Sequence, residues 1–184
     1  MDDETALWSA ALARDERAFG ILFDRHRDRV FRHALRLVDH RSEAEDVAAA
    51  AFFELWRRCE AVRIVEGSVL PRLLVTATNL CRNVARGTRR YRAMLSGFPR
   101  GEDGIDPAVV AGDRVDRAQE AERLHRAIAM LSADDAALLV LTAVEGWTAV
   151  RAAAAIGITP DAARTRLVRI RRLVRAELEN EGAR

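Results

Sequence analysis

The stretch EGWTAVRAAAAIGITPDAARTRLVRIRRLVR, residues 145–175, decides the fold of this chain, because it predicts two helices joined by a tight turn. Thr148 can cap the first helix, since a threonine side chain accepts a hydrogen bond from an unpaired N–H group of the opening turn. Gly157 stands where the end of a helix often requires positive φ, which glycine adopts without penalty. Thr159 and Pro160 then restart the chain as N-cap and first helical residue. The pattern is that of a helix-turn-helix.

The second predicted helix has an apolar stripe and a basic surface. The stripe consists of Ala162, Ala163, Leu167, Ile170, Leu173 and Val174. The basic residues are Arg164, Arg166, Arg169, Arg171, Arg172 and Arg175. A basic amphipathic helix also occurs as a merely solvated face, and this alternative stays open. The combination of alanine-rich helix, glycine turn and arginine-rich helix nevertheless favours binding in a DNA major groove.

The composition indicates a globular chain of one ordinary domain or two small ones, with 184 residues, 49% of them hydrophobic and 32% charged. No apolar run approaches the roughly 20 residues of a membrane helix, and the acidic start MDDETALWSA does not resemble a signal peptide. We therefore expect a cytoplasmic protein without membrane insertion. The net charge is only +2, but every basic residue is arginine, whose planar fork suits phosphates and guanine edges.

The sequence offers no support for an enzyme, a cofactor or a metal site. Cys59 and Cys81 are isolated, and the four histidines form no zinc-like spacing with them. Both cysteines are expected to be small packing residues. A phosphate-binding glycine motif, a nucleophile elbow and an acid–base pair are also missing.

The first part of the chain predicts three main helices after a short leading one. Apolar residues at three- and four-residue spacing indicate a long helix ending near Val38, and Ser42 with Glu45 predicts a capping box at the start of the next. The third helix runs from about Pro71 to Leu95. Its second half is basic and carries an aromatic residue, which suits a surface that tracks a nucleic-acid backbone and stacks on bases.

Residues 96–117 lack periodicity and are rich in glycine and proline, which predicts a flexible linker. The predicted fold is therefore all-α: two small helical domains, residues 1–95 and 118–184, joined by this linker, with the helix-turn-helix in the second.

Short motifs in a characteristic order now resemble a known family. They are Phe19-x-x-Leu22-Phe23-x-x-His26, Ala44-Glu45-Asp46, Leu55-Trp56, Ala77-Thr78-Asn79, Glu145-Gly146, Gly157-Ile158-Thr159 and Thr165-Arg166-Leu167. Each motif is weak alone, but their order and spacing across nearly the whole chain are specific. The chain resembles a bacterial RNA polymerase sigma factor of the extracytoplasmic-function (ECF) group, which binds core polymerase and recognises the minus-35 and minus-10 promoter elements to start transcription.

The resemblance implies roles for particular residues. Residues 43–57 would dock on the clamp helices of the largest polymerase subunit, and the second domain would meet the beta flap. The polymerase contacts would be Asp46, Glu54 and Trp56. Residues 61–68 and the following helix would hold the minus-10 element open without ATP, with contacts at Asn79, Asn83, Arg86, Arg89 and Arg90. The minus-35 element would be read by Arg164, Thr165, Arg166, Arg169, Arg171 and Arg172.

Some positions depart from the family pattern, and rival functions remain. Ala49 stands where the family usually has glutamine, Leu73 where it has tryptophan, and Asn83 where it often has aspartate. One alternative is a helix-turn-helix transcription regulator that acts without core polymerase, and another is a protein–protein adaptor. The tethered architecture and the family also suggest an anti-sigma protein as a partner that would wedge between the two domains.

Overall fold

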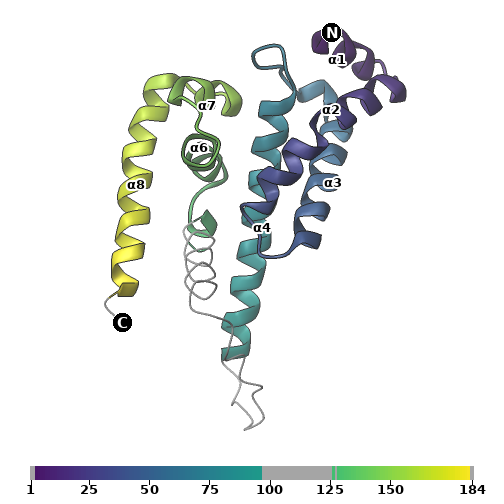
Figure 1. Ribbon diagram of the computed structural model, residues 1–184. Coiled ribbons are helices and arrows are strands. Elements are labelled where there is room, and N and C mark those ends of the chain that lie inside the picture. Colours follow the sequence, from purple (N-terminus) through teal and green to yellow (C-terminus); the bar gives the residue numbers. More distant parts are fainter. Residues whose placement is uncertain (1–2, 97–125, 127, 183–184) are drawn as a thin grey trace.

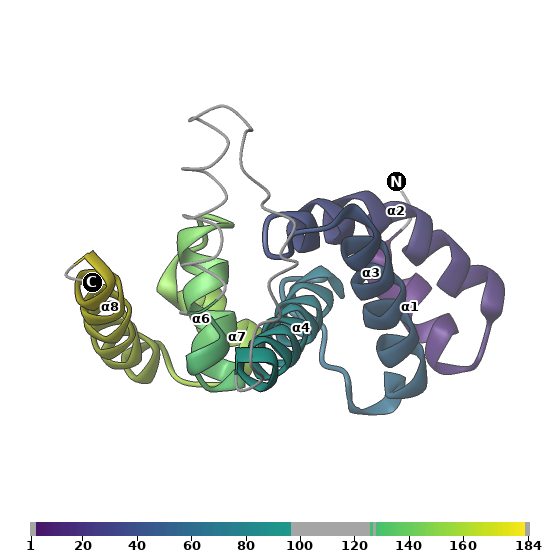
Figure 2. The same ribbon diagram turned by 90° about the horizontal axis from the view of Figure 1, so that it is seen from below.

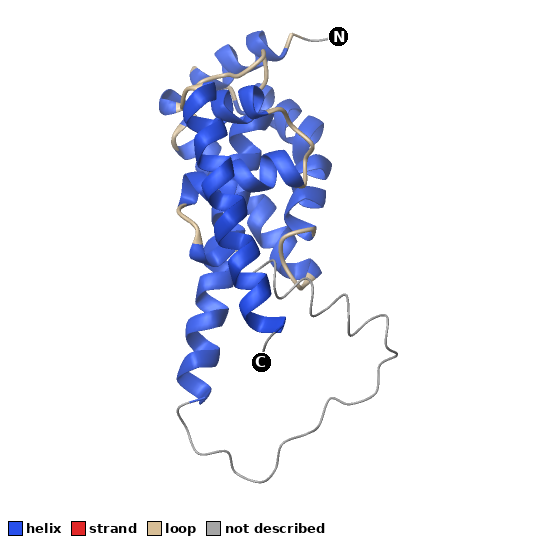
Figure 3. Ribbon diagram, turned by 90° about the vertical axis from the view of Figure 1, so that its left-hand side faces the viewer, coloured by secondary structure: helices blue, strands red, loops and turns tan. Residues whose placement is uncertain are grey.

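The computed structural model describes residues 3–96, 126 and 128–182, and among these it consists of helices and their connections (Figures 1 and 3). The helices are α1 (Glu4–Leu12), α2 (Glu16–Leu35), α3 (Arg41–Arg57), the short 3-10 helix η1 (Cys59–Ala61), α4 (Leu70–Ser96), α6 (Ala133–Ala143), α7 (Ala149–Ile156) and α8 (Pro160–Gly182). The all-α prediction is confirmed. Apart from Ser96, the predicted linker lies outside the described residues. None of the described helices is long and apolar enough to cross a membrane.

The local signals that defined the helix-turn-helix operate as expected. The N–H of Arg151 donates to the Thr148 hydroxyl at 3.2 Å, and the N–H of Ala162 donates to the Thr159 hydroxyl at 3.2 Å. Gly157 ends α7 with φ +76°, in the left-handed region. Gly157 and Thr159 therefore define the two ends of the turn between α7 and α8, and Thr148 caps the start of α7.

The predicted capping box at Ser42 is wrong. The N-cap of α3 lies two residues earlier, at His40, which makes no side-chain cap bond. Two contacts of Arg41 favour a helical conformation at this residue. Its Nε lies 2.9 Å from Glu45, one turn later, and its guanidinium lies 5.0 Å from the centre of the Phe31 ring.

The N-terminal half is built from α1 to α4, whose apolar faces meet in one core. Its most deeply buried members include Leu22, Val30, Ala34, Val47, Leu55, Leu73, Leu74 and Ala77. Cys59 and Cys81 are buried free thiols within it, as expected for packing residues. Burial raises the pKa of the Cys81 thiol to about 12.

In the C-terminal half, α6 packs against α7 and α8. Ala152 and Ala153 are completely buried, which lets the backbones of neighbouring helices approach closely. Leu167 and Ile170 of the predicted stripe are buried. Leu173 is exposed, whereas Val174 is partly buried against the apolar cluster. The long α8 forms one edge of the molecule (Figure 1).

The two halves lie in direct contact. Helix α4 packs against α6 and α7, while α8 lies on the side of the molecule remote from α1, α2 and α3 (Figures 1 and 2). At this junction Nε of Arg82 donates to the Leu131 carbonyl at 2.7 Å, and Arg151 pairs with Glu66 at 2.9 Å. One apolar cluster therefore runs through both halves.

Candidate nucleic-acid interface

The outward face of α8 is exposed, basic and close to the helix-turn-helix turn. Arg164, Thr165, Arg171 and Arg172 are all exposed on it. Val168 lies among them with 70% of its surface accessible, the largest value of the exposed large hydrophobic residues in the described chain. Positions 161, 165, 168 and 172 follow a spacing of three and four residues and so share one helix face. This face can present cations, a hydroxyl and an apolar contact to a single ligand.

Two of the six residues predicted to contact the minus-35 element form ion pairs with acidic side chains of α6. Nη2 of Arg169 lies 2.7 Å from Oδ2 of the buried Asp135, and Nη1 of Arg166 lies 3.6 Å from Asp134 and 3.8 Å from Asp135. Both arginines therefore fasten α8 to the start of α6. Five of the six residues are exposed, Arg169 among them, and Arg166 is partly buried.

A second basic surface follows the exposed side of α4. Asn79, Asn83, Arg86 and Arg90 recur at three- and four-residue spacing, and Arg89 lies on the same helix. The side-chain oxygen of Asn79 is buried without a hydrogen-bond partner. Burial lowers the pKa of the Arg82 guanidinium, and the like charge of Arg86 lowers it further. The second half of α4 therefore carries several positive charges close to one another.

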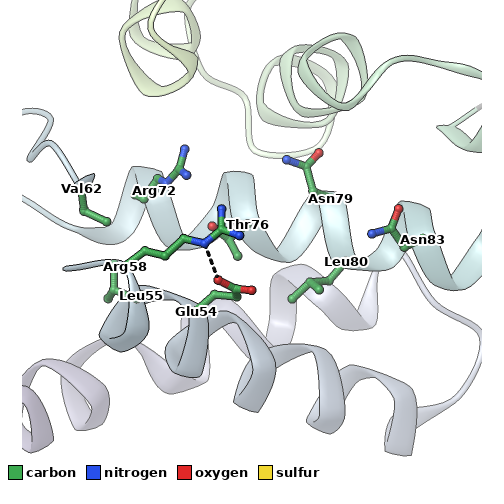
Figure 4. A pocket seen from close by; sticks show the side chains of 9 residues that line it. All are labelled: Glu54, Leu55, Arg58, Val62, Arg72, Thr76, Asn79, Leu80 and Asn83. Atoms are coloured by element: carbon green, nitrogen blue, oxygen red, sulfur yellow. Dashed lines mark ion pairs between the residues drawn. The ribbon is translucent and has the colours of Figure 1, made fainter. Parts of the chain in front are cut away.

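A pocket of about 280 Å³ opens between the end of α3, the loop after it and the first half of α4 (Figure 4). It is lined by Glu54, Leu55, Arg58, Val62, Arg72, Thr76, Asn79, Leu80 and Asn83. The amide groups of Asn79 and Asn83 lie on the same side of α4 in Figure 4. The pocket offers amides, a hydroxyl and two arginines, which together suit a polar ring with a nearby phosphate.

Glu54 belongs to this pocket and is held there by arginines. It accepts from Nη2 of Arg57 at 2.9 Å and lies 3.1 Å from Nε of Arg58. The hydrogen bond from Arg57 outweighs desolvation and, with the charges of Arg57, Arg58 and Arg72, lowers the pKa of Glu54. The predicted polymerase contact at Glu54 thus lies among the residues predicted for the minus-10 element.

The other two predicted polymerase contacts have different surroundings. Asp46 is exposed on α3. Trp56 is half-buried, with its ring 4.7 Å from the Phe19 ring and the Arg14 guanidinium 5.3 Å from its centre. Sequence reasoning missed Phe53, whose surface is 65% exposed on α3. The sequence signal was the four-residue spacing of the buried Val47, Ala51 and Leu55, which places Phe53 on the opposite side of α3.

A buried carboxylate of the C-terminal half, Glu145, contacts side chains of the N-terminal half. Glu145 precedes α7, its side chain is completely buried, and it forms ion pairs with Arg29, His33 and Arg36 of α2. Nδ1 of His33 lies 2.8 Å from Glu145, and its Nε2 lies 2.8 Å from the Thr78 hydroxyl, which itself donates to the Leu74 carbonyl. Burial raises the pKa of Glu145, but the hydrogen bond from His33 and the charges of His33, Arg29 and Arg36 outweigh it, so the net shift is downward.

Comparison with known proteins places both surfaces within one family. Residues 22–91 match Sigma-70 region 2, and residues 121–174 match Sigma-70, region 4. RNA polymerase sigma factor CarQ of Myxococcus xanthus is 36% identical over 172 residues, 91% of this chain and 94% of CarQ. The ECF RNA polymerase sigma factor SigL of Mycobacterium tuberculosis is 26% identical over 174 residues, 95% of this chain and 96% of SigL.

A solved structure shares the fold. CnrH, in complex with the cytosolic domain of CnrY, aligns with a TM-score of 0.55 at 22% identity, over 97% of this chain and 99% of that chain. The pocket and the basic side of α4 lie within the region 2 match, apart from the end of α4, and the turn between α7 and α8 lies within the region 4 match. The chain belongs to the ECF group of bacterial RNA polymerase sigma factors.

Proposed function

We propose that the two basic surfaces divide promoter recognition between them, with α8 on the minus-35 element and α4 with its pocket on the minus-10 element. As a sigma factor, the chain binds core RNA polymerase, recognises promoter DNA and promotes initiation of transcription. The observation that carries the assignment for α8 is its outward face, where exposed arginines surround Thr165 and Val168.

On the minus-35 element, Arg164 and Arg172 supply planar forks for guanine edges or phosphates. Val168 supplies an apolar contact, which suits the methyl group of thymine. Arg166 and Arg169 hold α8 in its orientation through Asp134 and Asp135 and reach phosphates from the flank.

On the minus-10 element, the pocket of about 280 Å³ receives a base that has left the duplex stack. Asn79 and Asn83 present amide donors and acceptors to its edge. Arg86 and Arg90 continue along α4 to the backbone phosphates, and the exposed Tyr91 offers a ring for stacking. Capture of the open strand uses binding energy and needs no ATP.

The exposed side of α3 is the proposed dock for core polymerase. Asp46 supplies a charge, and Phe53 supplies a large apolar anchor of the kind that dominates protein interfaces. Ala49 leaves room beside Phe53, where the family's usual glutamine would add a polar contact. Glu54 instead takes the role of fixing Arg57 and Arg58 at the pocket mouth.

We also infer the wider setting of the protein. We infer a division into domains 1–95 and 118–184, which the separate matches of residues 22–91 and 121–174 support, and each domain would supply one DNA surface. Like CnrH, which is bound to the cytosolic domain of CnrY, the chain would accept an anti-sigma partner. It acts in the cytoplasm beside the polymerase and catalyses no reaction itself.

Run-off transcription tests this function. Purified core polymerase from a GC-rich bacterium is assayed on a library of promoter fragments, with and without the protein. We expect transcripts only when the protein is added, their loss with Arg164→Glu, and their retention with Arg17→Ala, an exposed arginine of α2. Operator binding by the protein alone, without any transcript, would instead support the regulator acting without polymerase.

A further inference from the structure

The carboxylate of Glu4 lies where three segments of the N-terminal half meet. Its Oε1 accepts hydrogen bonds from the Val69 N–H at 2.8 Å and from the Ser68 hydroxyl at 2.8 Å, and it lies 2.9 Å from Nε2 of His26. Arg25 adds a longer ion pair at 3.7 Å. Only 13% of the Glu4 side chain is exposed. One acidic group near the start of α1 therefore connects α2 to the segment that enters α4.

That segment, residues 62–69, has little structure of its own. Val65 and Ser68 exchange two backbone hydrogen bonds of 3.1 Å, which close a tight turn. Glu66 and Gly67 at its tip have φ of +54° and +72°, and a Cβ at Gly67 would lie 4.0 Å from the Thr5 hydroxyl of α1. The turn is thus packed beside α1, the helix that carries Glu4.

Glu4 also controls how α4 begins. The Ser68 hydroxyl donates to Glu4 and accepts from the Leu70 N–H at 3.1 Å, so the same oxygen caps the first turn of α4. Without the carboxylate, the Ser68 hydroxyl and the Val69 N–H lose their shared acceptor. The one described ion pair from the loop tip, Glu66 with Arg151, involves two substantially exposed side chains and holds the loop weakly.

The loop and the first turn of α4 form one wall of the pocket. Val62 and Arg72 line it from this side, opposite Glu54 and Leu55 of α3. We propose that Glu4 is a positioning residue for recognition of the minus-10 element, because it fixes the loop that carries Val62 to the start of α4, the helix that carries Asn79 and Asn83. The inference rests on the proposed role of the pocket. It extends promoter recognition to a residue that lies before the Sigma-70 region 2 match, residues 22–91.

Removal of the carboxylate should not undock α1. Trp8 and Ala11 are buried in the core and anchor the helix through apolar contacts that do not involve Glu4. Several buried or half-buried hydrogen bonds would be lost, and each is worth enough to change an equilibrium several-fold. The expected consequence is a looser pocket in a folded protein.

The test measures base preference in the holoenzyme. Full-length protein bound to core polymerase is presented with a pool of single-stranded DNAs of about twelve nucleotides with randomised positions. The variants are Glu4→Ala, Glu4→Gln and Ser68→Ala, with Glu16→Ala as an exposed acidic control in the first turn of α2. Affinity for a duplex minus-35 fragment and for core polymerase is measured in parallel.

We expect Glu4→Ala to reduce discrimination between preferred and mismatched single strands by about fivefold to tenfold, with unchanged duplex and polymerase affinities. Glu4→Gln keeps an oxygen acceptor and should recover most of the discrimination, while Ser68→Ala should lose part of it. Unchanged discrimination in Glu4→Ala would overturn the inference, as would an equal loss of all three affinities, which indicates a purely structural role. A wild-type holoenzyme without any single-strand preference would instead refute the proposed function.

Discussion

Glu145→Ala should destabilise the protein through the junction between its two halves. The wild-type side chain is completely buried, and it contacts two arginines and a histidine of α2. Arg29 and Arg36 are 36% and 49% exposed, so water can replace the carboxylate around them at a cost of about 0–1 kcal/mol each. His33 is fully buried and loses a charge-assisted hydrogen bond worth about 1.5–3 kcal/mol. Together these terms predict a loss of about 1.5–5 kcal/mol.

Urea denaturation of the full chain at pH 7 measures this loss, with the exposed Glu60→Ala as the matched control. The contribution of the Glu145 carboxylate to the free energy of unfolding should also depend on pH. Because the folded-state pKa of Glu145 is lowered from its usual 4.5, its contribution is complete above that value and is lost as pH falls through the folded pKa. The stability difference between wild type and Glu145→Gln should therefore shrink below about pH 4.5. A loss no larger than that of Glu60→Ala, or a difference that does not vary with pH, would refute this reasoning.

Three further perturbations have expected outcomes. Gly157→Ala meets no atom within 4 Å but forces an alanine to φ +76°, and thermal unfolding should show a loss of about 1–2 kcal/mol. Phe53→Ser should weaken binding to core polymerase about tenfold in a fluorescence titration, while leaving the unfolding temperature unchanged because the side chain is 65% exposed. Asp135→Ala removes the 2.7 Å ion pair of Arg169 and should lower affinity for a minus-35 duplex, measured by anisotropy, because α8 loses its fixed orientation. An unchanged affinity would show that the ion pair does not orient α8.

Local signals in the sequence defined the helices of the second half well. Thr148, Gly157 and Thr159 act on residues within four positions of themselves, so their effect is readable from the chain alone. Ser42 shows the limit of this approach. Its motif satisfied the capping rule, but the pair of Arg41 with Glu45 and the contact of Arg41 with Phe31 favour an earlier start.

The orientation of the arginines on α8 could not be predicted in the same way. Arg166 and Arg169 were grouped with Arg164 because all are basic, and their partners Asp134 and Asp135 lie more than thirty positions earlier. Contacts across the junction join residues that are even farther apart in the sequence. Glu145 is paired with side chains of α2 that lie over one hundred positions earlier. Such pairs depend on how the two halves pack, which no local pattern specifies.

Photo-crosslinking can show whether α8 and α4 meet different promoter elements. A photoreactive residue is placed at the exposed Val168 or at the exposed Asn83, and the holoenzyme is bound to a promoter obtained by run-off selection. We expect crosslinks from position 168 within the minus-35 duplex and crosslinks from position 83 to one strand of the minus-10 element. Crosslinks from both positions to the same element, or from neither to the promoter, would contradict this expectation.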